Sequence, residues 1–152
     1  MPKRLRAKLV TTTHDEKMLA TTSHIPPGFA AVTPFLTVDD PDAMLAFAKS
    51  AFGAEEIKDQ RGIHDGKTQH LAFRVEGCVV EIGGAHGRWS GLASAIHLYV
   101  PDVDVAHARA VKAGGVSLHE VQQMEYGERA SAVQDPFGNQ WYIATHTTHG
   151  KK

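Results

Sequence analysis

The sequence has few of the features that mark secreted, membrane-embedded or nucleic-acid-binding proteins. Its 152 residues include one cysteine, so no disulfide can form within the chain. The formal net charge is -1, which gives no electrostatic reason to expect nucleic acid or an acidic membrane surface as a partner. No apolar run is long enough to span a bilayer. These absences favour a cytoplasmic globular protein, and the length suits one good core better than two large domains.

The single cysteine, Cys78, is followed by Val79, Val80 and Ile82. An apolar run of this kind predicts a buried strand. Burial in apolar surroundings disfavours the thiolate, which is the reactive form of cysteine. We therefore expect Cys78 to be a buried, inert thiol rather than a nucleophile.

The stretch from residue 95 to residue 115 predicts a strand, a helix and a stop. Apolar and other side chains alternate over residues 95–100, as in a strand with one covered face. Asp102 is a suitable helix N-cap, and apolar residues recur after it at helical spacing. Gly114 and Gly115 then end the helix.

The same pattern occurs earlier in the chain, at one constant offset. Residues 32–38 predict a strand, Asp40 occupies the position of Asp102, and Gly53 that of Gly115. A pattern that keeps its register from strand through cap to helix end indicates a duplicated module.

Three further strands are expected after each helix, at residues 56–60, 68–75 and 78–82 and at residues 116–121, 129–134 and 139–145. The sequence thus predicts an α+β chain of two tandem βαβββ modules. We assign residues 25–84 to module one, 85–93 to a linker and 94–146 to module two. Residues 1–24 are expected to form an arm that packs against this chain or a neighbour, and residues 147–152 a solvated tail.

Period-two counting places aliphatic side chains on the helix-covered face of each sheet and a mixed set on the other face, here called the open face. The mixed set comprises Thr33, Phe35, Thr37, His70, Ala72, Arg74, Glu81, His97, Tyr99, Arg129, Ser131, Gln140 and Tyr142. Aromatic, His, Glu and Arg side chains together make a poor dry core and a good pocket lining. We expect any ligand to bind on the open face.

Several stretches carry a family likeness: VTPFL at 32–36, AFGAE at 51–55, HLYVPDVD at 97–104, and YGER at 126–129 leading to DPFGNQW at 135–141. They resemble the vicinal oxygen chelate superfamily of glyoxalases, bleomycin-resistance proteins and extradiol dioxygenases, and within it the branch often labelled PhnB-like. The resemblance implies paired modules that form a curved mixed sheet around a concave pocket, usually in a homodimer. The fold hosts several unrelated activities, so it does not fix the chemistry.

The resemblance also implies a position for a metal. Metal-dependent members carry a His on the first strand and a Glu on the fourth strand of each module. The corresponding residues are Thr33, Glu81, Ala95 and Tyr142, and of these Glu81 alone keeps a ligand type. A displaced site of Glu81 and His97 is conceivable, but two protein ligands are too few for a tight site. We expect no metal, and a divalent metal is the one cofactor left open.

Glu81 and His97 are the candidate catalytic residues. Glu81 is either a structural carboxylate paired with Arg74 or Arg129, or a metal ligand or general base. For His97, a hydrogen-bonded histidine that lines a pocket is favoured over a catalytic role, and the same holds for His70.

The candidate ligand-binding residues are Phe35, His70, Tyr99, Tyr126, Arg129 and Tyr142. Arg129 follows a loop that could cover the pocket mouth, where it would hold a carboxylate or phosphonate through two hydrogen bonds. The alternative is a surface ion pair with Glu125 or Glu128. Trp89 is expected to anchor the linker rather than to act as a pocket lid. The remaining histidines, His107 included, are expected in tails, loops or exposed faces.

Two functions follow from these features. The favoured one is a protein that sequesters a toxic or antibiotic-like small molecule between two protomers, without the usual four-ligand metal site. The alternative is a metal-dependent lyase or isomerase, in which the metal acts as Lewis acid and stabilises an enediolate while Glu81 is a ligand or base. Whether the protein is an enzyme stays open between them.

Overall fold

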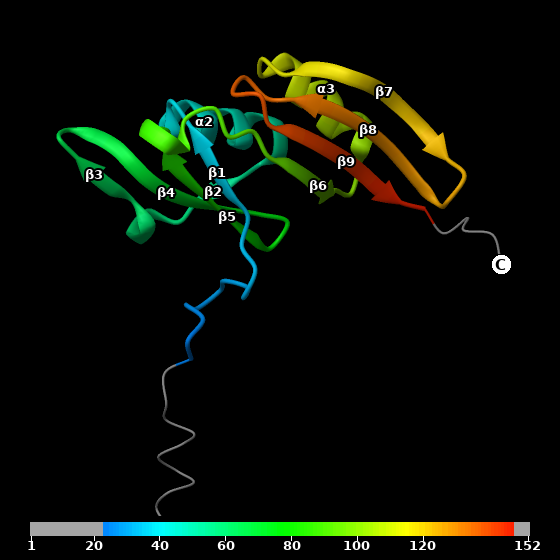
Figure 1. Ribbon diagram of the computed structural model, residues 1–152. Helices are drawn as coiled ribbons and strands as arrows, with labels where there is room; N and C mark the ends of the chain where they lie inside the picture. Colours follow the sequence, from blue (N-terminus) through cyan, green and yellow to red (C-terminus); the bar gives the residue numbers. More distant parts are fainter. Residues whose placement is uncertain (1–22, 148–152) are drawn as a thin grey trace, which may run out of the picture.

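The computed structural model describes residues 23–147 (Figure 1). Module one contains β1 (Phe35–Val38), α2 (Pro41–Phe52), β2 (Glu55–Glu56), the 3-10 turn η1 (Lys58–Gln60), β3 (Gly62–His64), β4 (Lys67–Val75) and β5 (Cys78–Gly84). The linker holds the 3-10 turn η2 (Gly87–Trp89). Module two contains β6 (Ala95–Tyr99), α3 (Val103–Lys112), β7 (Val116–Met124), β8 (Glu128–Gln134) and β9 (Gln140–His146). The predicted arm and tail lie almost entirely outside the described residues.

The strands form two mixed sheets, one from each module. The first has the order β1-β5-β4-β2, with β3 also paired to β4, and the second has the order β6-β9-β8-β7. The β1–β5 and β6–β9 pairs are parallel and the other pairs are antiparallel. The predicted α+β architecture of tandem modules is confirmed. Module one departs from it at two points: the strand expected at residues 56–60 is the short β2 followed by η1, and β3 is an additional strand.

Both helices begin at the predicted aspartates. The Asp40 carboxylate accepts a hydrogen bond from the Ala43 amide at 3.0 Å, and Asp102 accepts one from Val105 at 3.1 Å. The glycines at the two helix ends differ in role. Gly53 has a φ of 67°, whereas Gly115 is needed for close packing, since a Cβ there would lie 2.8 Å from the Ala110 carbonyl oxygen. Neither helix is long and apolar enough to cross a membrane, nor is any other helix within residues 23–147.

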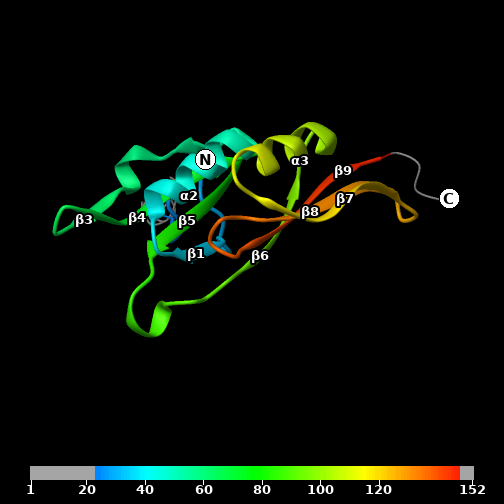
Figure 2. The ribbon, with the colours of Figure 1, turned by 90° about the horizontal axis from the view of Figure 1, so that it is seen from above.

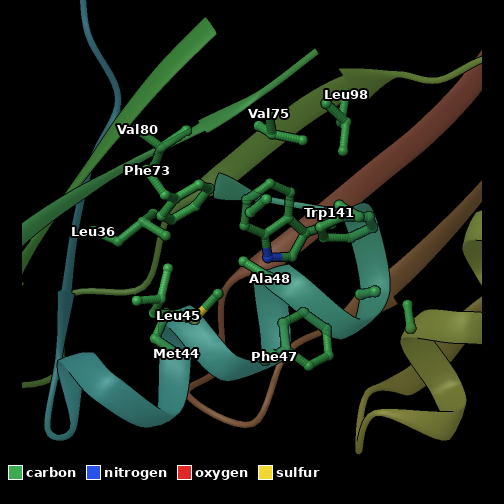
Figure 3. Packing of buried hydrophobic residues seen from close by; sticks show 14 of the residues in the cluster. Leu36, Met44, Leu45, Phe47, Ala48, Phe73, Val75, Val80, Leu98 and Trp141 are labelled. Atoms are coloured by element: carbon green, nitrogen blue, oxygen red, sulfur yellow. The ribbon is translucent and has the colours of Figure 1, made fainter. Parts of the chain in front are cut away.

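The two helices lie on the same side of the sheets and pack against each other (Figure 2). The core fills the space between the helices and the sheets, and it includes residues of both modules (Figure 3). Trp141 of β9 is fully buried, and its ring lies 4.9 Å from the Phe52 ring of α2. The modules therefore share one core, and the faces of the sheets opposite the helices are left for the site.

Candidate functional site

The open face carries most of the side chains that period-two counting places there. Three aromatic rings from three strands stay substantially exposed, with exposed fractions of 51% for Phe35, 53% for Tyr99 and 40% for Tyr142. Register explains their positions, because Phe35 pairs with Glu81 across β1 and β5, and His97 pairs with Tyr142 across β6 and β9. The predicted faces of β1, β4, β5, β6 and β9 agree with this arrangement.

The predicted face of β8 is wrong. Arg129 donates two hydrogen bonds of 2.7 Å to Asp104 at the start of α3, and Ser131 contacts His107 of the same helix. Both side chains therefore lie on the helix-covered side, and Arg129 does not join the other candidate residues. The ion-pair partner of Arg129 is therefore Asp104, whereas the sequence indicated Glu125 or Glu128. Asp104 holds the pKa of Arg129 above its ordinary value through these hydrogen bonds.

On the open face of module one, three candidates come together in a group that we call the His70 cluster: Phe35, His70 and Glu81. His70 Nε2 lies 3.3 Å from Glu81 Oε1, and the Phe35 and His70 ring centroids are 6.1 Å apart. The predicted partners of Glu81, Arg74 and Arg129, are replaced by this histidine. Both side chains of the His–Glu contact are about two-thirds buried or more, so it is shielded from bulk water.

Hydrogen-bond chemistry fixes one ring nitrogen of His70 as a donor. His70 Nδ1 lies 2.8 Å from the Gln60 carbonyl oxygen, which only accepts, so Nδ1 carries a hydrogen. A neutral ring then has an unprotonated Nε2, and two acceptors would face each other at Glu81. The contact becomes a hydrogen bond when His70 is an imidazolium or Glu81 is protonated. The proton between Nε2 and Glu81 therefore decides whether the two side chains are hydrogen bonded.

A cavity of about 320 Å³ adjoins the His70 cluster. It is lined by Phe35, Thr37, Gln69, His70, Gly83, Gly84, His86 and Trp89. Trp89 belongs to η2, is half exposed, and lies with its ring centroid 5.2 Å from that of His86. The sequence favoured Trp89 as a linker anchor over a pocket lid, and the structure places Trp89 among the residues that line this cavity.

On the open face of module two lies a second group, which we call the Glu128 cluster: His97, Tyr99 and Glu128. Tyr99 Oη donates a 2.5 Å hydrogen bond to Glu128 Oε1, and His97 Nε2 lies 3.7 Å from Glu128 Oε2. The hydrogen bond to the carboxylate raises the pKa of Tyr99 above its ordinary value. Glu128 is the central residue of this group. The sequence indicated Glu128 only as a partner of Arg129 in a surface ion pair.

The two candidate catalytic residues belong to different clusters. Glu81 contacts His70, whereas His97 contacts Glu128. Within the described residues, no group of three or more His, Cys, Asp or Glu side chains is placed to hold a metal ion. Each cluster offers one imidazole and one carboxylate, which is too few donors for a tight metal site. The side chains of residues 23–147 in one chain therefore do not make the metal site that the superfamily resemblance implies.

Grooves run along the seam between the modules. One of about 380 Å³ lies between β1 and β6, with Phe35 and His97 in its lining. Another of about 680 Å³ is lined by five residues between Gly28 and Pro34, by the β4–β5 hairpin and by β6, including Tyr99. Tyr126, in the β7–β8 turn, is 68% exposed and lines neither groove. Of the candidate residues, Phe35, His97 and Tyr99 thus line the grooves at the seam.

Two expectations about single residues are wrong. Cys78 is exposed rather than buried, because it starts β5 directly after the tight turn at Glu76 and Gly77. His107 is buried rather than exposed: Nδ1 lies 2.9 Å from Ser131 Oγ, and Nε2 lies 3.2 Å from Ser117 Oγ and 3.3 Å from Glu120. The polar side chains around His107 satisfy its ring, so it stabilises the interface between α3 and the second sheet.

Comparisons with known proteins agree with this architecture. An uncharacterised protein of Mycobacterium bovis is 34% identical over 124 residues, which span 74% of this chain and 81% of the relative. The crystal structure of TioX from Micromonospora has a TM-score of 0.67 at 21% identity, covering 77% of this chain and 98% of that one. The fosfomycin resistance protein FosX from Listeria monocytogenes, complexed with Mn(II) and sulfate, has a TM-score of 0.59 at 19% identity, covering 78% and 91%. At these identities the solved structures support the fold alone.

The family itself follows from the sequence profile. The profile of the glyoxalase/bleomycin resistance protein/dioxygenase superfamily matches residues 28–143, which include every strand and helix of both modules except the end of β9. Together with the tandem modules and their open faces, this match shows that the chain belongs to the glyoxalase/bleomycin resistance protein/dioxygenase superfamily.

Proposed function

We propose that this protein is a homodimer that binds a small organic molecule on the open faces of its sheets, and that it does so without a four-ligand metal site. The observation that carries the proposal is a set of three exposed aromatic rings on the open faces: Phe35 and Tyr99 line the grooves, and Tyr142 is on β9, the strand paired with that of Tyr99. Soluble proteins rarely expose neighbouring apolar groups without a partner or ligand to cover them. Polar groups at fixed positions among these rings would orient the ligand.

The arrangement of the sheets supports the dimer. The two sheets of one chain are separate and lie side by side (Figures 1 and 2). A second copy placed over an open face would enclose the ligand and cover the aromatic rings. As part of the same proposal we assign the chain to the PhnB-like branch of the superfamily, and the cytoplasmic location stays a prediction.

The oligomeric state gives the first test. We expect light scattering after gel filtration to report a dimer, and Phe35→Asp with Tyr142→Asp to shift it to a monomer, because charges would replace covered rings. Ile63→Asp is the control, since Ile63 lies at the far edge of the first sheet and is already exposed. A wild-type monomer, together with no melting shift from any compound in a small-molecule screen, would contradict the proposal.

One observation favours the metal-dependent lyase or isomerase as the second candidate. Each module presents one histidine–carboxylate pair on its open face, His70–Glu81 and His97–Glu128. Two such pairs brought together by a second copy would supply four donors of the types that divalent metals accept. The similar fold of FosX was solved with Mn(II) bound.

Metal content separates the two candidates. Protein purified without an affinity tag is assayed for metal, and its melting temperature is recorded after chelation and after addition of nickel, zinc, manganese or iron. We expect substoichiometric metal and no loss of melting temperature on chelation. Near-stoichiometric metal that Glu81→Gln and Glu128→Gln both abolish would replace the binding function with the metal-dependent one.

A further inference from the structure

We propose that the cavity beside the His70 cluster takes a flat aromatic molecule of about two rings that carries a hydroxyl or similar hydrogen-bonding group at one edge. We call this cavity the aromatic pocket and define it by Phe35, His70, His86 and Trp89, which line it together with Gln69 and two glycines. The inference rests on the proposed function, because it names the class of small molecule that the open face of module one would bind.

Two glycines make the wall formed by β5 flat. A Cβ on Gly83 would lie 2.7 Å from the Phe35 ring, and a Cβ on Gly84 would lie 3.0 Å from Gln69 Oε1. Glycine inside a strand often marks a place where another group approaches the backbone closely. Here the Phe35 ring and the Gln69 side chain lie against the bare backbone, and this leaves room for a ligand beside them.

The remaining lining favours ring stacking. Four ring side chains from β1, β4 and the linker line a single cavity of about 320 Å³. Aromatic pairs gain energy beyond their buried area when they stack offset or edge to face. The Arg88 guanidinium lies 5.4 Å from the Trp89 ring centroid, a cation–π distance that helps to hold the indole in place. A cavity this small is at the lower end of the range for ligand sites, which suits two fused rings and excludes a large antibiotic.

The polar side chains that line the pocket are Thr37, Gln69, His70 and His86. His70 lines the pocket with Nδ1 fixed by the Gln60 carbonyl oxygen, and its Nε2 lies 3.3 Å from Glu81 Oε1. His86 is fixed in a similar way, with Nδ1 2.9 Å from the Gly84 carbonyl oxygen, so its Nε2 is an acceptor in the neutral ring. A molecule with an apolar ring surface and one hydroxyl that donates to His86 Nε2 matches these groups.

The test compares two probes of the same carbon skeleton, 2-naphthol and decahydro-2-naphthol, by isothermal titration calorimetry with the full-length protein. Both carry one hydroxyl, and they differ in being flat or saturated. We expect 2-naphthol to bind at least about tenfold more tightly, which is the size of effect that stacking on aromatic side chains produces. A third probe, 2-methoxynaphthalene, has no hydroxyl to donate and should bind several-fold more weakly than 2-naphthol.

Two pairs of variants locate the binding. Trp89→Ala should weaken 2-naphthol binding roughly tenfold, whereas Trp89→Phe keeps a ring and should retain most of it. Gly83→Ala should weaken binding by displacing Phe35 into the pocket, whereas Gly62→Ala places its Cβ at an ordinary 3.6 Å from His70 and should not. Ile63→Ala, on the exposed edge strand outside the pocket, is the control for folding and general surface effects.

The outcomes separate this inference from the proposed function. Equal affinity for the flat and saturated probes, or binding that Trp89→Ala leaves unchanged, would overturn the aromatic pocket while the protein remained a binder of some other molecule. A failure of all three probes with a screen hit elsewhere on the open face would overturn it as well. A monomer with no ligand in any screen would instead overturn the proposed function.

Discussion

The two modules share a backbone plan and differ in the chemistry between helix and sheet. Leu45 of α2 and His107 of α3 occupy equivalent positions, since both follow the capping aspartate by the same number of residues. Leu71 pairs with Ile82 in the first sheet as Ser131 pairs with Ile143 in the second. An apolar pair in module one thus corresponds to the buried His107–Ser131 contact in module two.

The open faces differ in the same way. Phe35 beside Glu81 in module one corresponds to His97 beside Tyr142 in module two, so the ring and the ionisable group have exchanged strands. The difference teaches that the duplication preserves register and hydrogen-bonded pairs, because these depend on the backbone. The side chains that lie on that backbone are free to diverge, and each half of the site acquires its own chemistry.

The largest expected effect comes from the residue that joins the modules. Trp141→Ala removes a fully buried ring of module two that packs on Phe52 of module one, and leaves Asp135 without the indole N–H that it accepts at 3.0 Å. We expect the free energy of unfolding to fall by about 3–5 kcal/mol. Urea unfolding followed by circular dichroism measures this free energy. The control is Val116→Ala at an exposed position, whose free energy of unfolding should stay within about 0.5 kcal/mol of wild type. Loss of the second sheet alone would show that the modules are more independent than their shared core indicates.

A smaller effect tests whether the polar interface of module two can be made like that of module one. His107→Leu leaves the buried Ser131 hydroxyl without its partner and should cost about 1–3 kcal/mol. Adding Ser131→Ala removes the second polar group and should restore most of the loss, because the pair is then apolar on both sides. Chemical denaturation of the two single variants and the double variant gives the coupling energy. Additive losses would mean that the contact carries no special role.

Each module has an arginine clamp, by which we mean an arginine that is hydrogen bonded to nearby carboxylates. Its loss should lower the free energy of unfolding by a still smaller amount that depends on pH. Arg61 hydrogen bonds to Asp42 and Glu56 and holds the pKa of each carboxyl below its ordinary value of 3.8 or 4.5. A pKa lowered by folding contributes stability that is present above the unfolded value and lost as the pH falls through the folded one. Arg61→Gln should therefore cost about 0.2–1 kcal/mol per ion pair at pH 7. The gap from wild type should begin to narrow as the pH falls to about 4, near the unfolded-state pKa values, and should close only below the lowered folded-state values.

The equivalent clamp in module two is the exposed pair of Arg129 with Asp104, and Asp104 also has a lowered pKa. Because Arg129 has a single carboxylate partner and both side chains are substantially exposed, Arg129→Gln should have the weaker effect of the two. Melting curves from pH 3 to pH 7 compare the two variants. A larger loss for Arg129→Gln would reverse the ranking of the clamps.

The smallest effect is local to the Glu128 cluster. The hydrogen bond to Glu128 raises the pKa of Tyr99, so Glu128→Gln should bring its titration down toward the ordinary value of 10.0. Ultraviolet difference spectra of wild type and variant across the alkaline range measure the change. The same spectra are recorded in proteins that carry Tyr126→Phe and Tyr142→Phe, so that the titration can be assigned to Tyr99. An unchanged Tyr99 titration would show that the hydrogen bond does not persist in solution.

Much of the fold could be predicted because its signals are local. The capping aspartates, the glycines after the helices and the alternation in β1, β5, β6 and β9 each depend on residues a few positions apart. The face of β8 could not be obtained by counting within the strand. In module one, Val75 pairs with Cys78 across a two-residue turn, whereas in module two Asp135 and Asn139 enclose residues 136–138. One extra residue in the turn changes which side chains of β8 share a face with β9, since side chains alternate along a strand.

The sequence by itself determined the duplication, the superfamily and the set of strands that carry the open face. The tertiary structure alone decided the partners: Glu81 with His70, Glu128 with Tyr99 and His97, and Arg129 with Asp104. It also placed Trp89 of the linker at the aromatic pocket. The physical reason is distance along the chain. Periodicity and capping operate within a few residues, whereas these contacts join separate strands, helices and the linker, and they are fixed only when the sheets and helices pack.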